Sequence, residues 1–355
     1  MVQRNKLIGI NSSKIIDFSV NYGPFRFPRK FLKDIKINGE TIANYPKPNS
    51  EETTSLLAKY LGIEKENTLI SNGSSELFFL IPKIFKFKKT VLLEPTFWEY
   101  GEALRRNNLK VDSFILESKD NFKFDRDKFI RAIQNADCAY ICNPNNPTST
   151  LIERDILISL ISQFKDKIFV VDETYLLFLK NYNKLTLNDL STKVNNLIVI
   201  SSLSKIFSIG GIRLGFCVSS RKNISLIKKN MNPYSVNVFA QKLLPNLIKA
   251  KGYLSETKNF VAKEKLRVYE NLTKINGIKT FEPKANFIIF KIINQRVAPD
   301  ELFNYLNKAL IKVREGNIFP ALSDRFVRFS IKTRRENDLL LKKLKIFFQK
   351  KRYDK

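Results

Sequence analysis

The sequence predicts an α/β protein in which helices sandwich a mixed, mostly parallel sheet, with a smaller α+β domain at the C-terminus. Short β-branched segments alternate with helical patterns from about Thr68 to Ser220, and this alternation is typical of a mostly parallel sheet. After about Lys274 the order changes to strands interspersed with helices. A chain of 355 residues that is 43% hydrophobic is long enough for one large domain and a smaller one.

The strands expected in the large domain are separated by segments with a helical period. In chain order these strands are TLIS, TVLLEP, VDSFIL, CAYICNP, KIFVVDE, LIVISSL and GFCVSS. The helical patterns are SSELFFLIPKIF, FWEYGEALRRNN, DRDKFIRAIQNA and ERDILISLISQF. Ligands bind at the carboxyl ends of the strands in such sheets, so we expect the functional residues in the loops that follow the strands.

The chain divides into three expected parts. Residues 1–40 form an N-terminal arm with one short helix after Pro28, and residues 41–240 form the large domain. Residues 241–355 contain an interdomain helix and a small domain with the strands NFIIFKI, KVRE and FVRFSIK. The final segment, ENDLLLKKLKIFFQKK, places apolar residues near helical spacing, and we expect it to pack on the small domain rather than on a membrane.

Charge and composition narrow the possible functions. The formal net charge is +28, but the lysines are spread along the chain, so we expect neither a nucleic-acid partner nor a membrane partner. The absence of His excludes imidazole metal sites and Ser-His triads, so no metal is expected and any general base is Lys, a carboxylate, Tyr or Cys. Cys138, Cys142 and Cys217 fit buried hydrophobes in a reducing compartment, which predicts a cytoplasmic protein.

Lys205 is the first candidate catalytic residue. It follows the strand LIVIS and precedes Gly210 and Gly211, so its ammonium would lie above the carboxyl edge of the sheet. Desolvation at that place favours the neutral amine, which can form a Schiff base with a carbonyl compound. A lysine after a strand is more often a surface residue, so the interpretation depends on the residues around it.

Asp172 ends the apolar strand KIFVV, and a buried carboxylate requires a cationic or hydrogen-bonding partner. The protonated pyridine nitrogen of pyridoxal phosphate is such a partner, and its protonation makes the ring an electron sink. Two further residues could donate to the phenolate oxygen of the same ring. They are Tyr175, three residues after Asp172, and Asn146, in the turn NPNNPT. The structural alternative is that Asp172 caps the next helix and that NPNNPT is only a rigid turn.

A phosphate group requires backbone N–H groups at a helix start, hydroxyls and a cation. Phe97, directly after the strand TVLLEP, could stack on a cofactor ring. The candidate phosphate-binding residues are Gly73, Ser74, Ser75, Ser202, Ser204 and Arg213.

The order of these motifs resembles fold-type I pyridoxal-phosphate enzymes of the class I/II aminotransferase superfamily. The resemblance extends from DFSVNYGP to the final helix, and within the superfamily the chain is most similar to the branch of histidinol-phosphate aminotransferase and threonine-phosphate decarboxylase. IIDFSVNYGP, NYPKPNSEE and SLSKIFSIGGIRLGF resemble the decarboxylase somewhat more. Two features depart from the pattern: Ser149 replaces the usual glycine after NPNNPT, and the His-containing N-terminal segment of many decarboxylases is absent.

The resemblance implies pyridoxal 5′-phosphate as cofactor and a two-fold homodimer with shared active sites. It implies that Tyr45, in NYPKP, reaches the cofactor phosphate of the neighbouring subunit. It also implies that Arg328 binds the substrate carboxylate, which places Arg314 for a second anionic group. Two arginine forks indicate a small anionic amino-acid substrate, because a guanidinium binds carboxylate and phosphate oxygens bidentately.

Three hypotheses for the function follow. The leading one is an aminotransferase for an anionic, phosphorylated amino acid or amine, similar to histidinol-phosphate aminotransferase. The second is a decarboxylase for threonine phosphate or a related phospho-amino acid of cobalamin-type biosynthesis. The third is a non-catalytic pyridoxal-binding regulator that contacts nucleic acid.

Overall fold

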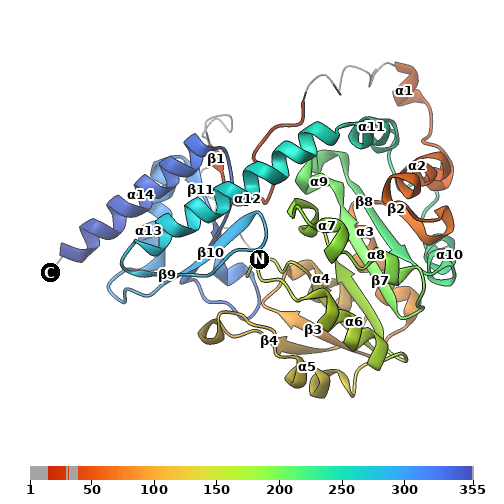
Figure 1. Cartoon of the computed structure of the whole chain (residues 1–355), viewed down its shortest axis with the longest axis horizontal. Coiled ribbons are helices and arrows are strands. Elements are labelled where there is room, and N and C mark those ends of the chain that lie inside the picture. The colour runs from red at the N-terminus through yellow and green to blue at the C-terminus, as the bar shows by residue number, and fades with distance from the viewer. Residues whose placement is uncertain (1–14, 29–30, 32–38, 354–355) are drawn as a thin grey trace.

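In the computed structural model, residues 15–28, 31 and 39–353 are described, and they form a large and a small domain joined by a long helix (Figure 1). The helix predicted directly after Pro28 lies outside the described residues. The first described helix, α1, is Gly39–Ala43.

The large domain is built on a seven-stranded sheet with the order β2-β8-β7-β6-β5-β3-β4. Only β8 runs antiparallel to its neighbours in this sheet, which confirms the predicted mixed, mostly parallel arrangement. The strands are β2 Thr68–Asn72, β3 Lys89–Glu94, β4 Lys110–Ile115, β5 Cys138–Cys142, β6 Ile168–Asp172, β7 Leu197–Ser202 and β8 Leu214–Ser219.

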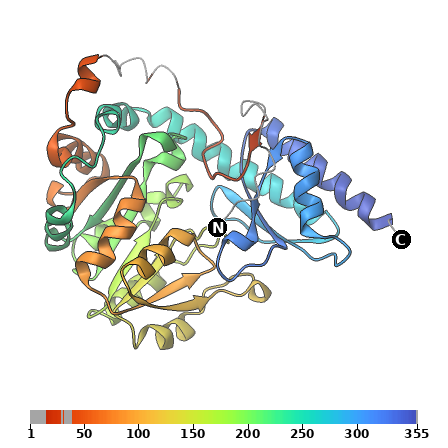
Figure 2. The ribbon, with the colours of Figure 1, turned by 180° about the vertical axis from the view of Figure 1, so that it is seen from behind.

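The central strands are buried on both faces, and their side chains alternate between two hydrophobic cores. On β5, Tyr140 packs in one core and Ile141 in the other. Helices therefore cover both faces (Figure 2). The first core includes residues of α2 Glu51–Leu61, α3 Ser74–Phe85, α4 Trp98–Arg106, α10 Arg221–Asn230 and α11 Val238–Lys249. The second includes residues of α5 Arg126–Ile133 and α6 Arg154–Gln163.

The small domain has an antiparallel sheet with the order β12-β13-β10-β9 and a separate core. The helix α12, Lys251–Thr273, runs from the large domain to the small one (Figure 1). The other elements are β9 Ile278–Thr280, β10 Phe287–Ile292, α13 Pro299–Lys308, β12 Arg314–Glu315, β13 Phe326–Ser330 and α14 Arg334–Tyr353. Leu340, Leu344 and Phe348 of α14 are buried in this core, so the final helix packs on the small domain as predicted.

The first described residues of the N-terminal arm pack on the small domain, whereas Phe27, further along the arm, is buried in the first core of the large domain. The strand β1, Ile16–Asp17, pairs in parallel with β11, Ile311–Lys312. The next residue, Phe18, is fully buried in the core of the small domain. The chain then passes between the domains, and this anchoring brings residues 19–22 to the carboxyl edge of the large sheet, where they line a cavity.

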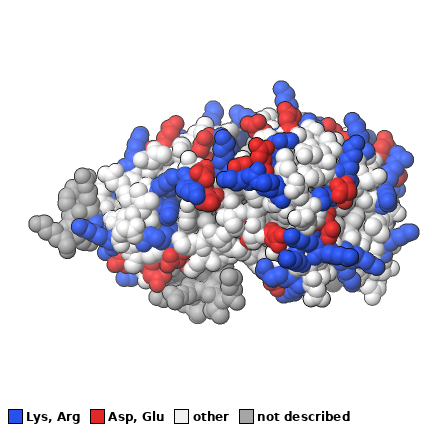
Figure 3. Space-filling model, turned by 90° about the horizontal axis from the view of Figure 1, so that it is seen from below, with Lys and Arg blue, Asp and Glu red and all other residues white. Residues whose placement is uncertain are grey.

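Lysine and arginine side chains occur over most of the face shown in Figure 3, and fewer aspartate and glutamate side chains lie among them. No helix in the described part of the chain combines the length and apolar character needed to cross a bilayer.

Candidate active site

A cavity of about 450 Å³ opens at the carboxyl ends of β5, β6 and β7, between the two domains. It brings together most of the residues predicted from the sequence, from both domains. Those that line it are Ser74, Ser75, Phe97, Asn146, Asp172, Tyr175, Ser202, Ser204, Lys205, Arg213, Arg314 and Arg328.

Lys205 lies on the short helix α9, Leu203–Ile206, directly after β7. Ser202 caps this helix, because its hydroxyl accepts a hydrogen bond from Ser204 N at 3.2 Å. The Lys205 Nζ lies 5.3 Å from the ring centroid of Tyr22. Burial, assisted by the nearby positive charge of Arg328, lowers the pKa of Lys205 to about 8. At neutral to mildly alkaline pH this lysine therefore has a substantial fraction of neutral, nucleophilic amine.

Asp172 is buried at the end of β6 and has no cation within ion-pair distance among the described residues. Its Oδ1 accepts a hydrogen bond from Thr174 N at 2.8 Å, but the next helical turn, Leu176–Phe178, begins after Tyr175 and has no side-chain cap, so Asp172 does not cap it. Its Oδ2 accepts one from the Tyr100 hydroxyl at 2.7 Å. Burial still raises the pKa of Asp172. A cationic group placed in the cavity would therefore stabilise its charged form.

Tyr175, Asn146 and Arg328 form a connected network. The Asn146 amide donates to the Tyr175 hydroxyl at 3.5 Å, and Asn146 Oδ1 accepts from Arg328 Nη1 at 2.7 Å. Asn21 of the arm also donates to the Tyr175 hydroxyl, at 3.3 Å. Because this hydroxyl oxygen acts as an acceptor in both contacts, its own hydrogen can be donated to a group in the cavity.

Ser149, the departure from the glycine of the related enzymes, adopts a left-handed backbone with φ of 62°. Its hydroxyl accepts a hydrogen bond from Ala285 N at 2.9 Å, and its carbonyl accepts one from Lys284 N at 2.8 Å. These two contacts hold the turn in the conformation that glycine adopts more easily. The turn after NPNNPT is thus anchored to residues 284–285 through Ser149.

The start of α3 forms an anion cradle with Arg213. Gly73 precedes the helix with φ of 73°, and a Cβ at this position would collide with the Arg213 guanidinium. Gly215 of β8 packs against the Gly73 carbonyl and Ser74 N, where any side chain would collide. The Ser75 hydroxyl donates to Glu99 at 2.5 Å. Backbone N–H groups, hydroxyls and a guanidinium thus meet at one end of the cavity, as a phosphate requires.

Arg314 and Arg328 are direct cross-strand partners on β12 and β13. Arg328 is 4% exposed, and its Nε has no hydrogen-bond partner among the described residues. Burial lowers the pKa of Arg328 to about 9. Arg314 Nε donates to the Ser19 carbonyl at 3.3 Å, and Arg328 Nη2 donates to the same oxygen. Two adjacent guanidinium groups with neutral protein partners favour an anionic ligand.

Tyr45 is the predicted site residue that lies apart from this cavity. Its side chain is 85% exposed, and its ring centroid lies 5.4 Å from that of Tyr234. Sequence reasoning missed Ser19, Asn21, Tyr22 and Tyr100, which also line the cavity. The polar and aromatic segment DFSVNYGP could have indicated the first three, because such residues are unusual in a plain connecting arm.

No group of three or more carboxylates and thiols in the described residues is placed to hold a metal ion.

Comparison with known proteins places this site in a family. Residues 13–344 match the model of the aminotransferase class I and II family, so the chain belongs to this family and its cofactor is pyridoxal 5′-phosphate. The histidinol-phosphate aminotransferase of Thermoanaerobacter pseudethanolicus is 31% identical over 331 residues, covering 92% of this chain and 91% of that protein. A protein of Caldanaerobacter subterraneus subsp. tengcongensis named "Putative threonine-phosphate decarboxylase" is 30% identical over 310 residues, covering 87% and 84%.

A solved structure confirms the fold. The histidinol-phosphate aminotransferase of Clostridium acetobutylicum superposes with a TM-score of 0.87 and 28% identity, and the match covers 95% of this chain and all of that one. The residues described above fit the cofactor of the family in three respects. Lys205 has a pKa lowered to about 8, Asp172 has no cation within ion-pair distance in the part of the chain that the structure describes, and Gly73 with Arg213 forms an anion cradle.

Proposed function

We propose that this chain is a pyridoxal-phosphate-dependent aminotransferase that acts on an anionic, phosphorylated amino acid or amine, as its histidinol-phosphate aminotransferase relatives do by name. The observation that carries the proposal is the pair Arg314 and Arg328, which line the same cavity as Lys205. A phospho-amino acid, which has two anionic groups, would engage both guanidinium groups, whereas a phosphorylated amine would engage one of them.

The residues that would bind the cofactor form two groups, one around its ring and one around its phosphate. Asp172 would keep the ring nitrogen protonated, Phe97 would pack on the ring, and Tyr175 and Asn146 would hold the ring oxygen. The phosphate would be held by Gly73, Ser74, Ser75, Ser202, Ser204 and Arg213. When bound, the cofactor supplies an electron sink for the bond that breaks at the substrate α-carbon.

Lys205 would first hold the cofactor and then move a proton. Once a substrate amine is bound, the free Lys205 amine would be the base that accepts the substrate α-proton and holds it for return. Its lowered pKa suits this task, since a general base is most effective when its pKa is close to the working pH. Arg328, donating to Asn146 Oδ1 at 2.7 Å, would couple the position of the substrate carboxylate to the ring oxygen.

The second candidate is a phospho-amino-acid decarboxylase, which the likeness to the Caldanaerobacter protein supports. Both reactions require the same residues around the cofactor. They differ in which group leaves the α-carbon, the hydrogen or the carboxylate. The contacts of Arg328 would decide which of the two leaves, because they fix the carboxylate.

One experiment separates the two candidates. The purified holoenzyme is incubated with a 2-oxo acid as amino acceptor and with histidinol phosphate, threonine phosphate, phosphoserine or their unphosphorylated parents, and carbonyl product and released carbon dioxide are measured together. We expect carbonyl product without carbon dioxide from at least one phosphorylated compound. Carbon dioxide in equal amount to the substrate consumed would establish the decarboxylase, and turnover of unphosphorylated parents alone would remove the phosphate from the proposal.

We further infer a homodimer with shared active sites, working in the cytoplasm. The high exposure of Tyr45 and its distance from the cavity of its own subunit support a role across an interface. The three cysteines are buried and unpaired, as suits a reducing compartment. Mixing Tyr45→Ala and Lys205→Ala subunits tests the sharing, because a mixed dimer would recover one intact site. Activity no higher than the sum of the separate variants would contradict it.

A further inference from the structure

A second cavity, of about 510 Å³, lies behind the helix that carries Lys205, and we call it the rear pocket. The residues of α9 divide between the two cavities. Ser204 and Lys205 line the active-site cavity, whereas Leu203 and Ile206 line the rear pocket. Its apolar wall is completed by Leu177, Phe207, Phe216 and Leu254. A molecule in the rear pocket would therefore contact the other side of the lysine helix.

The polar wall of the rear pocket contains an unsatisfied acceptor. Asn188, on α8 Asn188–Ser191, is 6% exposed, and its Nδ2 donates to the Tyr182 hydroxyl at 3.1 Å. Its Oδ1 is buried and has no donor among the described residues. A buried amide oxygen without a hydrogen bond is unfavourable, so an N–H donor of a ligand that reached Asn188 Oδ1 would stabilise this side chain.

The same wall contains a cation without a counter-ion. Lys258 of α12 is half-buried, and its Nζ lies 5.5 Å from the ring centroid of Tyr182. No carboxylate of the described residues lies within ion-pair distance of it, and burial lowers its pKa. Asp189, on the same rim, is already bound bidentately by Arg154 at 2.7 and 2.8 Å. Lys258 is therefore available to an anion.

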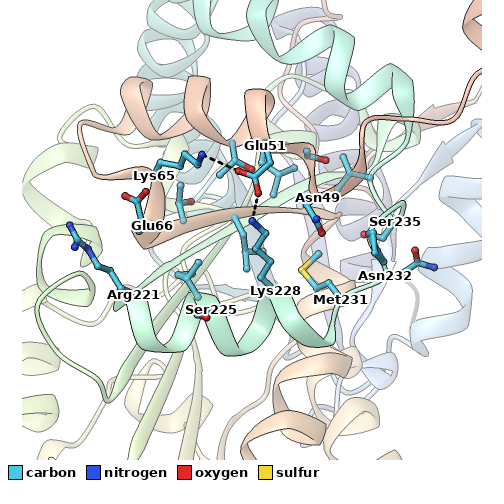
Figure 4. Close-up of a pocket in the computed structure, with 18 residues that line it drawn as sticks. Asn49, Glu51, Lys65, Glu66, Arg221, Ser225, Lys228, Met231, Asn232 and Ser235 are labelled. Atoms are coloured by element: carbon cyan, nitrogen blue, oxygen red, sulfur yellow. Dashed lines mark hydrogen bonds and ion pairs between the residues drawn. The ribbon is translucent and has the colours of Figure 1, made fainter.

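The pocket between α2 and α10 shows the opposite arrangement (Figure 4). There the Glu51 carboxylate lies between Lys65, at 3.0 Å, and Lys228, so each of these three charges has an opposite charge beside it. That pocket presents no comparable requirement for a charged ligand.

We propose that the rear pocket binds a small apolar or aromatic α-amino acid. The carboxylate would pair with Lys258, the ammonium would donate to Asn188 Oδ1, and the side chain would pack on Leu203, Ile206 and Phe216. Tyr182 contacts both polar residues, which brings the two charged groups of one amino acid within reach of their partners. This proposal does not depend on which reaction occurs in the active-site cavity.

An occupied rear pocket would also contact the support of Asp172. Thr186, which lines the pocket, donates to Glu173 at 2.6 Å, and Leu187 N donates to the same carboxylate at 2.8 Å. Glu173 directly follows Asp172 in the chain. The ligand would thus contact both the lysine helix and the segment next to the aspartate, which gives it a route to change activity.

The test is calorimetric titration of L-phenylalanine into the holoenzyme, with 3-phenylpropanoate and 2-phenylethylamine as probes that lack one charged group. We expect saturable binding of phenylalanine and weaker binding of both analogues. Lys258→Met should weaken binding by about tenfold or more, as the loss of a charge-assisted contact predicts. Lys263→Met, at an exposed position on the same helix, is the matched control and should leave binding unchanged.

Two further variants locate the binding. Leu254→Trp should fill the pocket and abolish binding, with the visible absorbance of the bound cofactor confirming that the protein is folded. Arg328→Ala should leave phenylalanine binding unchanged. No saturable binding to the wild type, binding unaffected by Lys258→Met, or binding abolished by Arg328→Ala would each overturn the proposal. The last result would place the amino acid in the active-site cavity.

Discussion

The active-site cavity and the pocket between α2 and α10 both contain charged side chains, but they treat these charges differently. In the α2–α10 pocket Glu51 is bound by two lysines, and each side chain remains partly exposed. In the active-site cavity Asp172 and Arg328 are buried and have no opposite charge within ion-pair distance among the described residues. An unpaired buried charge costs several kcal/mol, so its retention indicates a ligand that pairs with it. The charges of the α2–α10 pocket stabilise the fold, whereas those of the active-site cavity are placed to bind a cofactor and a substrate.

The largest expected effect is that of Lys205→Ala, because it removes both the covalent attachment and the proton carrier. We expect loss of the visible absorbance of the bound cofactor, and a fall in kcat/KM of about 10⁴-fold, as for the loss of a general base. The thermal unfolding transition should remain cooperative. An unchanged borohydride-reducible adduct in the variant would show that another residue holds the cofactor.

Asp172→Asn should have the next largest effect. A neutral amide cannot hold the ring nitrogen protonated. We therefore expect the activation free energy to rise by about 3 kcal/mol, which lowers kcat, while part of the cofactor remains bound. Asp112→Asn, which removes a partly exposed ion pair with Lys89, is the control and should leave kcat unchanged. Near-normal kcat with full cofactor occupancy in Asp172→Asn would refute the assigned role.

Much of this site could be predicted because it depends on local sequence signals. Strands that end in polar residues predicted Asp172 and Asn146 at the carboxyl edge of the sheet, and the glycine and serines before a helical pattern predicted the anion cradle. The segments KVRE and FVRFS predicted that Arg314 and Arg328 could lie together, and their cross-strand pairing has this geometry.

The unpredicted contacts arise from tertiary packing between distant segments. The pairing of Ile16 with Ile311 carries the arm into the cavity, and no periodicity in either segment identifies that partner. The Tyr100 hydroxyl reaches Asp172 because α4 packs beside the sheet core, although its position in the sequence looks like that of an ordinary helix residue. Asn188 and Lys258 meet at Tyr182 for the same reason.

Arg314 and Arg328 are expected to bind different anionic groups of the substrate, and single substitutions test this difference. Arg328→Ala should impair every amino-acid substrate, because it removes the buried guanidinium that contacts Asn146. Arg314→Ala should impair phosphorylated substrates selectively, by about 2 kcal/mol for a lost charge-assisted contact. The measurement is kcat/KM for a phosphorylated amino acid and its unphosphorylated parent in each variant. Equal losses for both substrates in Arg314→Ala would remove the phosphate-binding role.

The pKa of Lys205 predicts how cofactor uptake depends on pH. Burial lowers this pKa to about 8, so the reactive neutral amine appears well below the pH at which an ordinary lysine loses its proton. The rate of cofactor incorporation into the apoprotein should rise about tenfold per pH unit below pH 8 and level off above it. Arg328→Ala should shift the midpoint upward, because the positive charge of Arg328 contributes to the lowering. A midpoint near pH 10 in the wild type would contradict the burial of the amine.

The smallest effect is expected in the α2–α10 pocket, where Glu51→Gln removes the carboxylate between Lys65 and Lys228. These side chains are 42–46% exposed, so solvent screens the pairs and the loss in free energy of unfolding should be about 1 kcal/mol or less. The two lysines lower the pKa of Glu51, so this contribution is present above the carboxyl's unfolded-state pKa and is lost as the pH falls through its lowered value.

Glu52→Gln, which removes only the more exposed pair with Lys47, is the matched control. Urea unfolding of both variants at pH 7 and pH 3 measures the difference. A loss of several kcal/mol, or a loss of cofactor, in Glu51→Gln would mean that the α2–α10 pocket is coupled to the active site, and the distinction between the two regions would fail.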